Sequence, residues 1–495
     1  MYKKSLFFAV FVGFVCLVAC GKKDEELKNF QSLAHKFYSN DGSLSREEID
    51  SLKNSFKADS VDAFIDTLHK ILTDMGLSID KKILENPPSE QLRHFTLVVE
   101  RSQSMEGYVN GATEFQTTLY GLISDLENEF SGEQRVCLIG RTMECKGKDA
   151  SLERYTRILT ADSLKISEKG KKKSVDGSDL NAVLDTVLTI VNDSTMIALV
   201  SDFIFAPENF RCLDEKTKQG QDLKKRQEQD LDNLMAQQEI GIKSVFAKKL
   251  EKFNHLSVLV LQFYSNFNGD YFDKNDCKKK INQARPYYIW LIGSDLQIAK
   301  LLKNQKLEQL KNYKNKAFFS AANSVKIPIE IGYPAIEGNF SSSELRNAII
   351  SNAKPSKNGV FSFSVYVDFS KILENYSKFL NFLDSDNYKI NNADYQLEIL
   401  PVEPAHEFIF IEKATHKLNI NTNQKQEFLA DAEIKISLHN YLPEWVALSS
   451  SKDDSAVIDS TTFGLNYLLG GVYSAFVSKG NNLANFDFTI KRVRK

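Results

Sequence analysis

Histidine and cysteine are scarce in this sequence, and its charges nearly cancel. The 495 residues include seven histidines and six cysteines, with no Cys-X-X-Cys pair and no Cys/His cluster at metal-binding spacing. Zinc sites and Cys/His nucleophiles are built from these residue types, so neither kind of site has support. The 63 basic and 65 acidic residues leave a net charge of −2. Bulk charge therefore predicts no nucleic-acid partner.

Long apolar runs are also missing, apart from one near the start of the chain. Residues 6–18 are almost continuously apolar and follow two lysines, but the run is too short to span a membrane as a mature helix. It ends in Leu17-Val18-Ala19-Cys20, which resembles the lipobox of bacterial lipoproteins. The resemblance implies that residues 1–19 are a signal peptide and that Cys20 carries the lipid anchor. The alternative is an ordinary cleaved signal peptide with an incidental cysteine.

The residues after Cys20 predict where the anchored protein would lie. Gly21-Lys-Lys-Asp-Glu-Glu26 resembles the surface-export signal of Bacteroidetes lipoproteins. We therefore expect a cell-envelope protein, held in the outer membrane by its lipid and exposed at the cell surface. The alternative for this charged run is a solvated tether without an export role.

Four further cysteines, Cys137, Cys145, Cys212 and Cys277, would remain in the mature chain. An envelope location permits disulfides, but spacing alone does not fix their pairing. Cys212 and Cys277 both follow strands that we expect to end at the same edge of a sheet.

The length predicts two or three domains, and the apolar pattern changes along the chain. Residues 20–90 read as a lipidated tether followed by a helical segment, which Pro87-Pro88 ends. In residues 91–325 short apolar strands alternate with helices, with a charged helical insertion at 213–252. This alternation predicts an α/β fold with a doubly wound, mostly parallel sheet.

The hydrophobic period becomes two in residues 326–495, which predicts a β-rich domain. Residues 361–367 place alternate apolar side chains on one face, and further strands are expected at 395–400 and 432–438. A sandwich is one arrangement that such strands adopt. Thr462 to Phe476 has helical spacing despite a Gly470-Gly471 pair, and we expect a packing helix.

Acids and hydroxyls gather at the predicted ends of two strands and at the start of one helix. Glu100 ends the strand 94–100 and is followed by Ser102 and Ser104. Ser178 directly precedes the helix that begins near 180, and Asp202 follows the strand 196–200. Ligands of parallel sheets bind at the carboxyl ends of strands, and such oxygens suit Mg²⁺ or Ca²⁺.

The order of these three motifs resembles that of the von Willebrand factor A (VWA) family, over roughly residues 91–305. That family carries a metal-ion-dependent adhesion site, or MIDAS. Glu100-Arg-Ser-Gln-Ser-Met105 resembles its DxSxSM motif, Gly177-Ser-Asp-Leu180 its threonine loop, and Val200-Ser-Asp202 its third motif. The resemblance implies a Rossmann-like fold and a metal site formed by Glu100, Ser102, Ser104, Ser178 and Asp202.

Two residues depart from the family pattern. Glu100 stands where the family has aspartate, and its extra methylene moves the carboxylate by roughly 1.5 Å. Mg²⁺ tolerates such a shift poorly in a direct ligand and better in one that acts through water. Ser178 stands where the family has threonine, which keeps the hydroxyl but loses the stiff side-chain torsion.

The resemblance implies recognition of a protein partner. Mg²⁺, or else Mn²⁺ or Ca²⁺, would leave one coordination position open for a carboxylate that the partner presents. Met105, Glu106 and Tyr108 would line the rim of the site, and a turn at 264–270 is a further rim candidate.

Two other functions remain open. The chain could be a scaffold of an envelope complex in which the metal site is vestigial. It could instead be a metal-assisted hydrolase, but among the histidines only His94 lies near the motifs, at the opposite end of its strand. Without a readable nucleophile and base, we expect a binding protein and not an enzyme.

Overall fold

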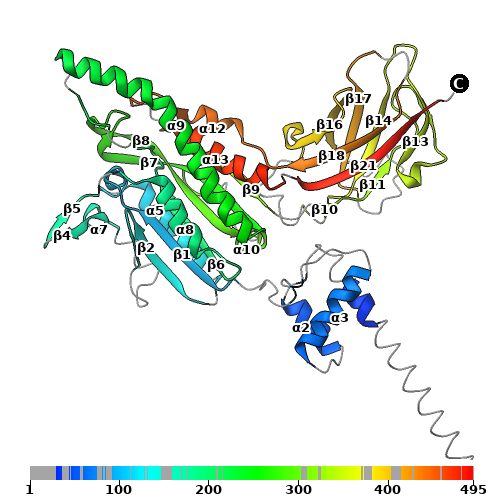
Figure 1. Ribbon diagram of the computed structural model, residues 1–495, viewed down its shortest axis with the longest axis horizontal. Helices are drawn as coiled ribbons and strands as arrows, with labels where there is room; N and C mark the ends of the chain where they lie inside the picture. The colour runs from blue at the N-terminus through cyan, green and yellow to red at the C-terminus, as the bar shows by residue number, and fades with distance from the viewer. Residues whose placement is uncertain are drawn as a thin grey trace, which may run out of the picture. The chain divides into compact units, whose positions relative to one another are not determined.

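The computed structural model describes residues 29–35, 44, 46–55, 60–74, 81 and 84, and most of the chain from 92 to 493 (Figure 1). The gaps after residue 92 are 112, 128, 131, 146–158, 169, 176, 208–209, 214–215, 303–308, 322–324, 370–371, 373–381, 403–413, 426–428, 458–459 and 481. The predicted signal peptide and the lipidation site Cys20 lie outside the described residues.

The chain divides into two compact units, residues 1–91 and 92–495. In the first unit, the described residues form a helix at 29–35, α2 (Arg46–Ser55) and α3 (Val61–Asp74). Apolar side chains that recur at helical spacing, such as Phe30, Leu52 and Phe64, pack into a small core. The predicted helical character of this region is confirmed for the part that is described.

The second unit contains a seven-stranded sheet in the order β3-β2-β1-β6-β8-β7-β9. Its strands are β1 (His94–Glu100), β2 (Gln134–Ile139), β3 (Met143–Cys145), β6 (Thr195–Ser201), β7 (Leu256–Phe272), β8 (Lys278–Ser294) and β9 (Tyr313–Ser320). Strand β1 runs parallel to both of its neighbours, β2 and β6. The pairs β2–β3, β6–β8, β8–β7 and β7–β9 are antiparallel.

The sheet is therefore mixed, which corrects the expectation of a mostly parallel one. Parallel pairing in this sheet is confined to β2, β1 and β6, because β8 lies between β6 and β7 and runs antiparallel to both. The later strands β7 and β8 are 17 residues each and pair along their whole length as a hairpin. The segment 264–270, expected as a turn, lies inside β7, since its Asn and Gly residues pair with β8 instead of reversing the chain.

Helices cover both faces of this sheet. Side chains of α5 (Glu114–Glu127), such as Phe115 and Leu119, pack on the face that contains Leu97 and Val99 of β1. The opposite face, which contains Val98, is covered by α8 (Leu180–Ile190), α9 (Lys218–Lys252) and α13 (Leu465–Ser478). A shorter helix, α10 (Asp295–Leu302), follows β8. The expected α/β arrangement, with helices on both faces of a central sheet, is thus confirmed.

The predicted insertion at 213–252 contains α9, which packs against α8 and α13 (Figure 1). Its carboxyl-terminal half buries Ile242, Phe246 and Leu250, so this half is part of the core and not a solvated helix. At Gly471 of α13, an added Cβ would lie 2.6 Å from the carbonyl oxygen of Glu239 on α9. The Gly470-Gly471 pair therefore permits the close approach of two helices.

Residues after β9 form two further sheets that share one core. One has the order β12-β13-β21-β18-β15, with β10 paired to β21, and the other has the order β11-β14-β17-β16. The ring centroids of Phe363 on β14 and Phe488 on β21 lie 5.6 Å apart, so the two sheets face each other. This agrees with the expected β-rich domain. The strands are β10 (Val325–Lys326), β11 (Ile329–Ile331), β12 (Asn339–Ser341), β13 (Ile349–Lys354), β14 (Ser362–Val367), β15 (Tyr388–Ile390), β16 (Tyr395–Pro401), β17 (His416–Thr422), β18 (Ala432–His439) and β21 (Asn482–Arg492).

Between β18 and β21 the chain returns to the seven-stranded sheet. There α12 (Glu444–Leu448) places the indole of Trp445 on edge strand β9, where its Nε1 donates to the carbonyl oxygen of Lys316 at 2.8 Å. Short strands β19 (Ser450–Ser451) and β20 (Thr462–Phe463) lead into α13.

A small hairpin of β4 (Ile166–Glu168) and β5 (Lys171–Lys173) follows α7 (Ala161–Leu164). None of the described helices combines the length and apolar character needed to cross a membrane.

Candidate functional site

The carboxylate of Glu100, at the end of β1, collects four hydrogen bonds. The backbone nitrogen of Ser102 donates to Oε1 at 2.9 Å, and the Ser102 hydroxyl donates to Oε2 at 2.8 Å. The hydroxyl of Ser178 donates to Oε1, and that of Ser201 to Oε2 at 3.3 Å. Glu100 is only 2% exposed, so the burial of its carboxylate depends on these donors.

Two local structures bring the serines to Glu100. After β1 the chain enters a 3₁₀ helix at Gln103–Tyr108, and the nitrogen of Gln103 donates to the carbonyl oxygen of Val175 at 2.8 Å. This bond ties the Ser102 turn to the loop before α8. Asp179 caps α8 by accepting from the nitrogen of Asn181 at 2.9 Å, which fixes the residue before it, Ser178, beside the turn.

Asp202 follows β6, the strand next to β1, and its carboxyl group is buried. The nitrogen of Ile204 lies 3.4 Å from Oδ1. The other oxygen, Oδ2, is buried and accepts no hydrogen bond from the described residues. The hydroxyl of Ser104 lies near enough to lower the pKa of Asp202, without reaching hydrogen-bond geometry. One carboxylate oxygen at the site thus lacks a partner.

The backbone turns sharply after Asp202. Phe203 has a φ of +50°, a left-handed conformation that side chains with a Cβ rarely adopt. Its ring is fully buried and stacks on Trp290 of β8 at 4.6 Å. Its nitrogen donates to the hydroxyl of Ser201 at 2.8 Å. Packing of the Phe203 ring therefore stabilises a strained backbone conformation next to Asp202.

Two buried acids face each other at this site. Burial and the nearby charge of Asp202 raise the pKa of Glu100 from 4.5 to about 7, against the lowering effect of the Ser178 and Ser102 hydrogen bonds. Burial also raises the pKa of Asp202, while Ser104 and the buried Arg285 favour its charged form. A cation between these acids would favour ionisation of both.

The site lies where the sheet order reverses. From β1 the chain passes through α5 to β2 on one side, and it later passes through α8 to β6 on the other side. Among the strands of this sheet, the order therefore begins 3-2-1-4, as in doubly wound folds. Ligands of such sheets bind in the crevice outside the strand ends at this reversal, between β1 and β6.

A cavity of about 700 Å³ opens above these strand ends. Glu100, Ser102, Ser104, Ser178 and Asp202 all line it, so the structure brings the five predicted side chains together. The loop after Asp202 forms one wall with Ile204, Phe205 and Phe210, and α9 contributes Leu234. The tip of the β7–β8 hairpin contributes Phe272, Asp273 and Asp276.

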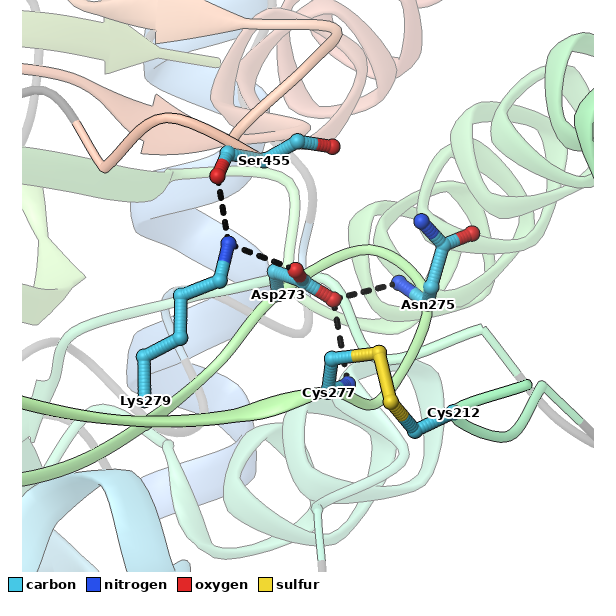
Figure 2. Close-up of a disulfide and its surroundings, with 6 residues drawn as sticks. All are labelled: Cys212, Asp273, Asn275, Cys277, Lys279 and Ser455. Atoms are coloured by element: carbon cyan, nitrogen blue, oxygen red, sulfur yellow. Dashed lines mark hydrogen bonds and ion pairs between the residues drawn. A yellow bond between two sulfur atoms is a disulfide. The ribbon is translucent and has the colours of Figure 1, made fainter. Parts of the chain in front are cut away.

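A disulfide joins two walls of this cavity. Cys212, at the end of the loop that follows Asp202, is bonded to Cys277 at the hairpin tip (Figure 2). The sequence left this pairing open, although both cysteines follow strands that were expected to end at the same edge of the sheet. The second disulfide, Cys137–Cys145, crosses directly between β2 and β3. Cys137, Cys145, Cys212 and Cys277 are thus all paired in two disulfides.

Asp273 organises the hairpin tip (Figure 2). Its Oδ1 accepts from the backbone nitrogens of Asn275 at 2.9 Å and Cys277 at 3.0 Å, and its Oδ2 lies 2.8 Å from Nζ of Lys279. Lys279 Nζ also donates to the carbonyl oxygen of Ser455. Although Asp273 lines the cavity, these contacts occupy its carboxylate in holding the tip.

Several rim residues differ from expectation. Met105 and Tyr108 are buried in the core, and the Tyr108 hydroxyl donates to the carbonyl oxygen of Pro286 at 2.6 Å. Neither residue lines the cavity, and neither does Glu106; Gln103 does. The 3₁₀ turn after Ser102 causes this difference, because it points Met105 and Tyr108 into the sheet instead of over the site.

The sequence pointed to Ser201 beside Asp202 but did not place it among the metal ligands, and it did not identify the wall loop. Ser201 is adjacent to a predicted residue and carries a hydroxyl, so the motif itself offered a clue. The wall loop is apolar and lies between a strand and an insertion, and no sequence pattern distinguishes it from core. Arg285 lies within a long strand, 83 residues after Asp202 (285 − 202), and only the hairpin brings it near.

The donor set limits which metals the site could hold. Among the residues that the structure describes, no group of three or more His, Cys, Asp and Glu side chains is arranged to hold a metal ion. A cation at this site would therefore depend on Asp202, on serine hydroxyls and on water. Such oxygen ligands suit Mg²⁺, Mn²⁺ or Ca²⁺ and are poor ligands for softer metals.

No relative helps to interpret these residues. Comparisons with models of known protein families, with curated proteins and with solved structures give no significant match for the chain. The chemistry of the site is therefore argued from its own geometry.

Proposed function

We propose that residues 92–495 bind a divalent cation at Asp202 and, through it, a carboxylate of a protein partner. The main support is that Oδ2 of Asp202 is buried beside the cavity and has no hydrogen-bond partner among the described residues. An unpaired buried carboxylate oxygen is costly, and a cation in the cavity would remove that cost. The hydroxyls of Ser102, Ser104 and Ser178 line the same cavity.

The hydrogen bonds of Glu100 support this proposal. A hydroxyl that binds a cation directs a lone pair at the ion and its proton at another acceptor. The hydroxyls of Ser102 and Ser178 both donate to Glu100, and the Ser102 oxygen also accepts from the Ser104 hydroxyl at 2.8 Å, so each of the three oxygens keeps a lone pair for a cation. Glu100 would then act as the proton acceptor behind the ligands and not as a direct ligand. The longer side chain that departs from the family pattern is compatible with this role.

The resemblance to VWA domains agrees with this arrangement. Glu100, Ser102 and Ser104 stand at the first motif, Ser178 at the second and Asp202 at the third, and all five share one cavity at the reversal of the sheet order. Mg²⁺ is the cation that we propose, with Mn²⁺ and Ca²⁺ as alternatives. When bound, it would supply an open coordination position that attracts a carboxylate.

The lining of the cavity supports recognition over hydrolysis. Its described residues include no histidine, lysine or cysteine. A general base must lie within hydrogen-bond reach of the proton that it abstracts. The donors to the Glu100 carboxylate are Ser102, Ser178 and Ser201, which surround its two oxygens and separate them from a substrate water.

We also propose that the chain is a lipoprotein, anchored at Cys20 in the outer membrane and exposed at the cell surface. The lipobox-like Leu17-Val18-Ala19-Cys20 carries this part of the proposal. The two disulfides support an oxidising compartment outside the cytoplasm. Metabolic labelling with an alkyne fatty acid, for the wild type and Cys20→Ser, would detect the anchor, and label on the variant would contradict it.

Calorimetric titration with MgCl₂, MnCl₂ and CaCl₂ tests the cation site. The protein would be residues 21–495, which retain every described residue. We expect the wild type to bind and Asp202→Asn to lose binding, while the matched control Asp185→Asn, an exposed acid of α8, binds normally. No binding by the wild type would contradict the proposal and favour a scaffold with a vestigial site.

A further inference from the structure

The cavity beside Asp202 is larger than a cation and one carboxylate require. Its volume of about 700 Å³ falls within the range of sites that enclose a whole small ligand, roughly 300–1,000 Å³. One wall is apolar and is formed by Ile204, Phe205 and Phe210 of the loop after Asp202 and by Leu234 of α9. We call these four residues the apolar wall. Its loop side chains are half-buried, so they remain accessible from the cavity.

The described residues of this loop, 203–207 and 210–213, are held in place at three points. Phe203 at its start stacks on Trp290. The nitrogen of Phe205 donates to the carbonyl oxygen of Phe463 at 3.1 Å, and the two rings stack at 6.1 Å. Cys212 at its end is bonded to Cys277. An apolar surface that is already ordered loses little conformational entropy when a ligand covers it.

The charges around the cavity are mostly negative. Asp179 and Asp276 line it in addition to Glu100 and Asp202, whereas Asp273 is paired with Lys279, and Arg141 is the cation among its described lining residues. A bound divalent ion would balance the acids at the floor and attract one carboxylate. Further acidic groups on the same ligand would meet the rim acids and be repelled.

We infer that the site takes a linear segment of a partner protein in which a single Asp or Glu stands next to a bulky apolar residue. The carboxylate is held at the cation and the apolar side chain covers Phe205 and Phe210. This inference rests on the proposed cation, because the acids of the cavity would otherwise repel a carboxylate. The apolar wall thus determines specificity, and the cation determines the requirement for an acid.

Selection from a random peptide library displayed on phage tests the inference. Residues 21–495 would be immobilised with Mg²⁺ and bound phage eluted with EDTA. We expect enriched peptides to share one acidic residue within two positions of Phe, Tyr, Trp, Leu or Ile. Enrichment of acid-rich peptides, of peptides whose acid lacks an apolar neighbour, or of no peptide at all would overturn the inference.

Variants of the wall separate the inference from the cation proposal. With a selected synthetic peptide, Phe210→Asn should weaken binding at least about tenfold, which corresponds to about 1.4 kcal/mol. Its Mg²⁺ affinity should stay near that of the wild type at a temperature below the unfolding transition of both proteins, since Phe210 also packs against Leu231, Met235 and Phe463 and its loss lowers the unfolding midpoint. Phe205→Leu is a second, milder variant, and Leu448→Asn, an apolar residue of α12 that is 71% exposed, is the matched control.

The two failures are distinguishable. If Mg²⁺ does not bind the wild type, the cation proposal fails and takes the inference with it. If Mg²⁺ binds but Phe210→Asn and Phe205→Leu bind the peptide as tightly as the control does, the inference alone fails.

Discussion

The hydroxyl of Ser178 donates a hydrogen bond to Oε1 of Glu100, which lies 78 residues earlier in the chain. This bond joins the start of α8 to the end of β1 and helps to satisfy a carboxylate that the fold has buried. Ser178 also lines the cavity, so its side chain stabilises the fold and is a proposed ligand of the cation.

Replacing Ser178 should therefore affect stability as well as binding. Ser178→Ala leaves Oε1 with the nitrogen of Ser102 as its remaining donor, and we expect a loss of about 1–3 kcal/mol in the free energy of unfolding. Ser178→Thr retains the hydroxyl and should cost less. Urea denaturation without metal measures both variants, and an alanine variant as stable as the wild type would contradict the role of this bond.

The pair of buried acids predicts a pH dependence of the metal-free protein. The pKa of Glu100 is raised from 4.5 when unfolded to about 7 when folded. Its contribution to stability is then fully present below pH 4.5 and is lost as the pH rises through 7, by an amount on the order of 3 kcal/mol. Glu100→Gln removes this loss and should be the more stable protein at pH 8 in EDTA.

Comparing the two proteins isolates this effect. Burial lowers the pKa of His416 and His439, so their contributions change in the opposite direction, but equally in both proteins. Thermal unfolding from pH 5 to pH 8 would measure the difference. Parallel profiles for the wild type and Glu100→Gln would show that Glu100 does not hold a proton in the folded protein.

Phe203 should show the signature of a left-handed residue. Phe203→Ala removes its stacking on Trp290, and we expect a cost of about 3–5 kcal/mol. Phe203→Gly loses the same contact but adopts the φ of +50° without strain. The glycine variant should therefore be at least as stable as the alanine variant. At a position with ordinary φ, alanine would be the more stable by about 0.5–1 kcal/mol, and that result would contradict the turn.

The two disulfides should differ in their contribution to stability. Cys212–Cys277 closes a sequence separation of 65 residues and Cys137–Cys145 one of 8. Chain entropy then predicts losses of about 4 and about 2.5 kcal/mol for the respective double serine variants. Chemical denaturation of both variants measures these losses. Because the longer link also joins two walls of the cavity, only its removal should weaken peptide binding, and equal binding by both variants would argue against that role.

Strand ends were the part of the site that the sequence could predict. The apolar run that includes Val98 and Val99 stops at Glu100, and the run that includes Leu199 and Val200 stops at Ser201-Asp202. In a sheet with parallel central strands, such ends meet at one edge, whatever the rest of the fold does. Glu100 and Asp202 could therefore be placed together from the strand ends, whereas Ser178 was added through the resemblance of its loop to the VWA motif.

The surroundings of the site depend on pairings that leave little trace in the sequence. The strand β7 continues through polar, Asn-rich residues because β8 pairs with it, and neither half carries an apolar alternation there. The position of Tyr108 follows from a 3₁₀ turn, which one changed backbone torsion would redirect. Likewise Phe205 is fixed by Phe463, from the last part of the chain.

Anomalous scattering from crystals of residues 21–495 grown with Mn²⁺ tests the central claim most directly. We expect a single strong peak in the cavity, within coordination distance of Oδ2 of Asp202 and of the hydroxyls of Ser102, Ser104 or Ser178. We also expect that Glu100 remains behind these hydroxyls, and that the peak is lost in Asp202→Asn. A cavity without a peak, or manganese bound only elsewhere on the protein, would contradict the account.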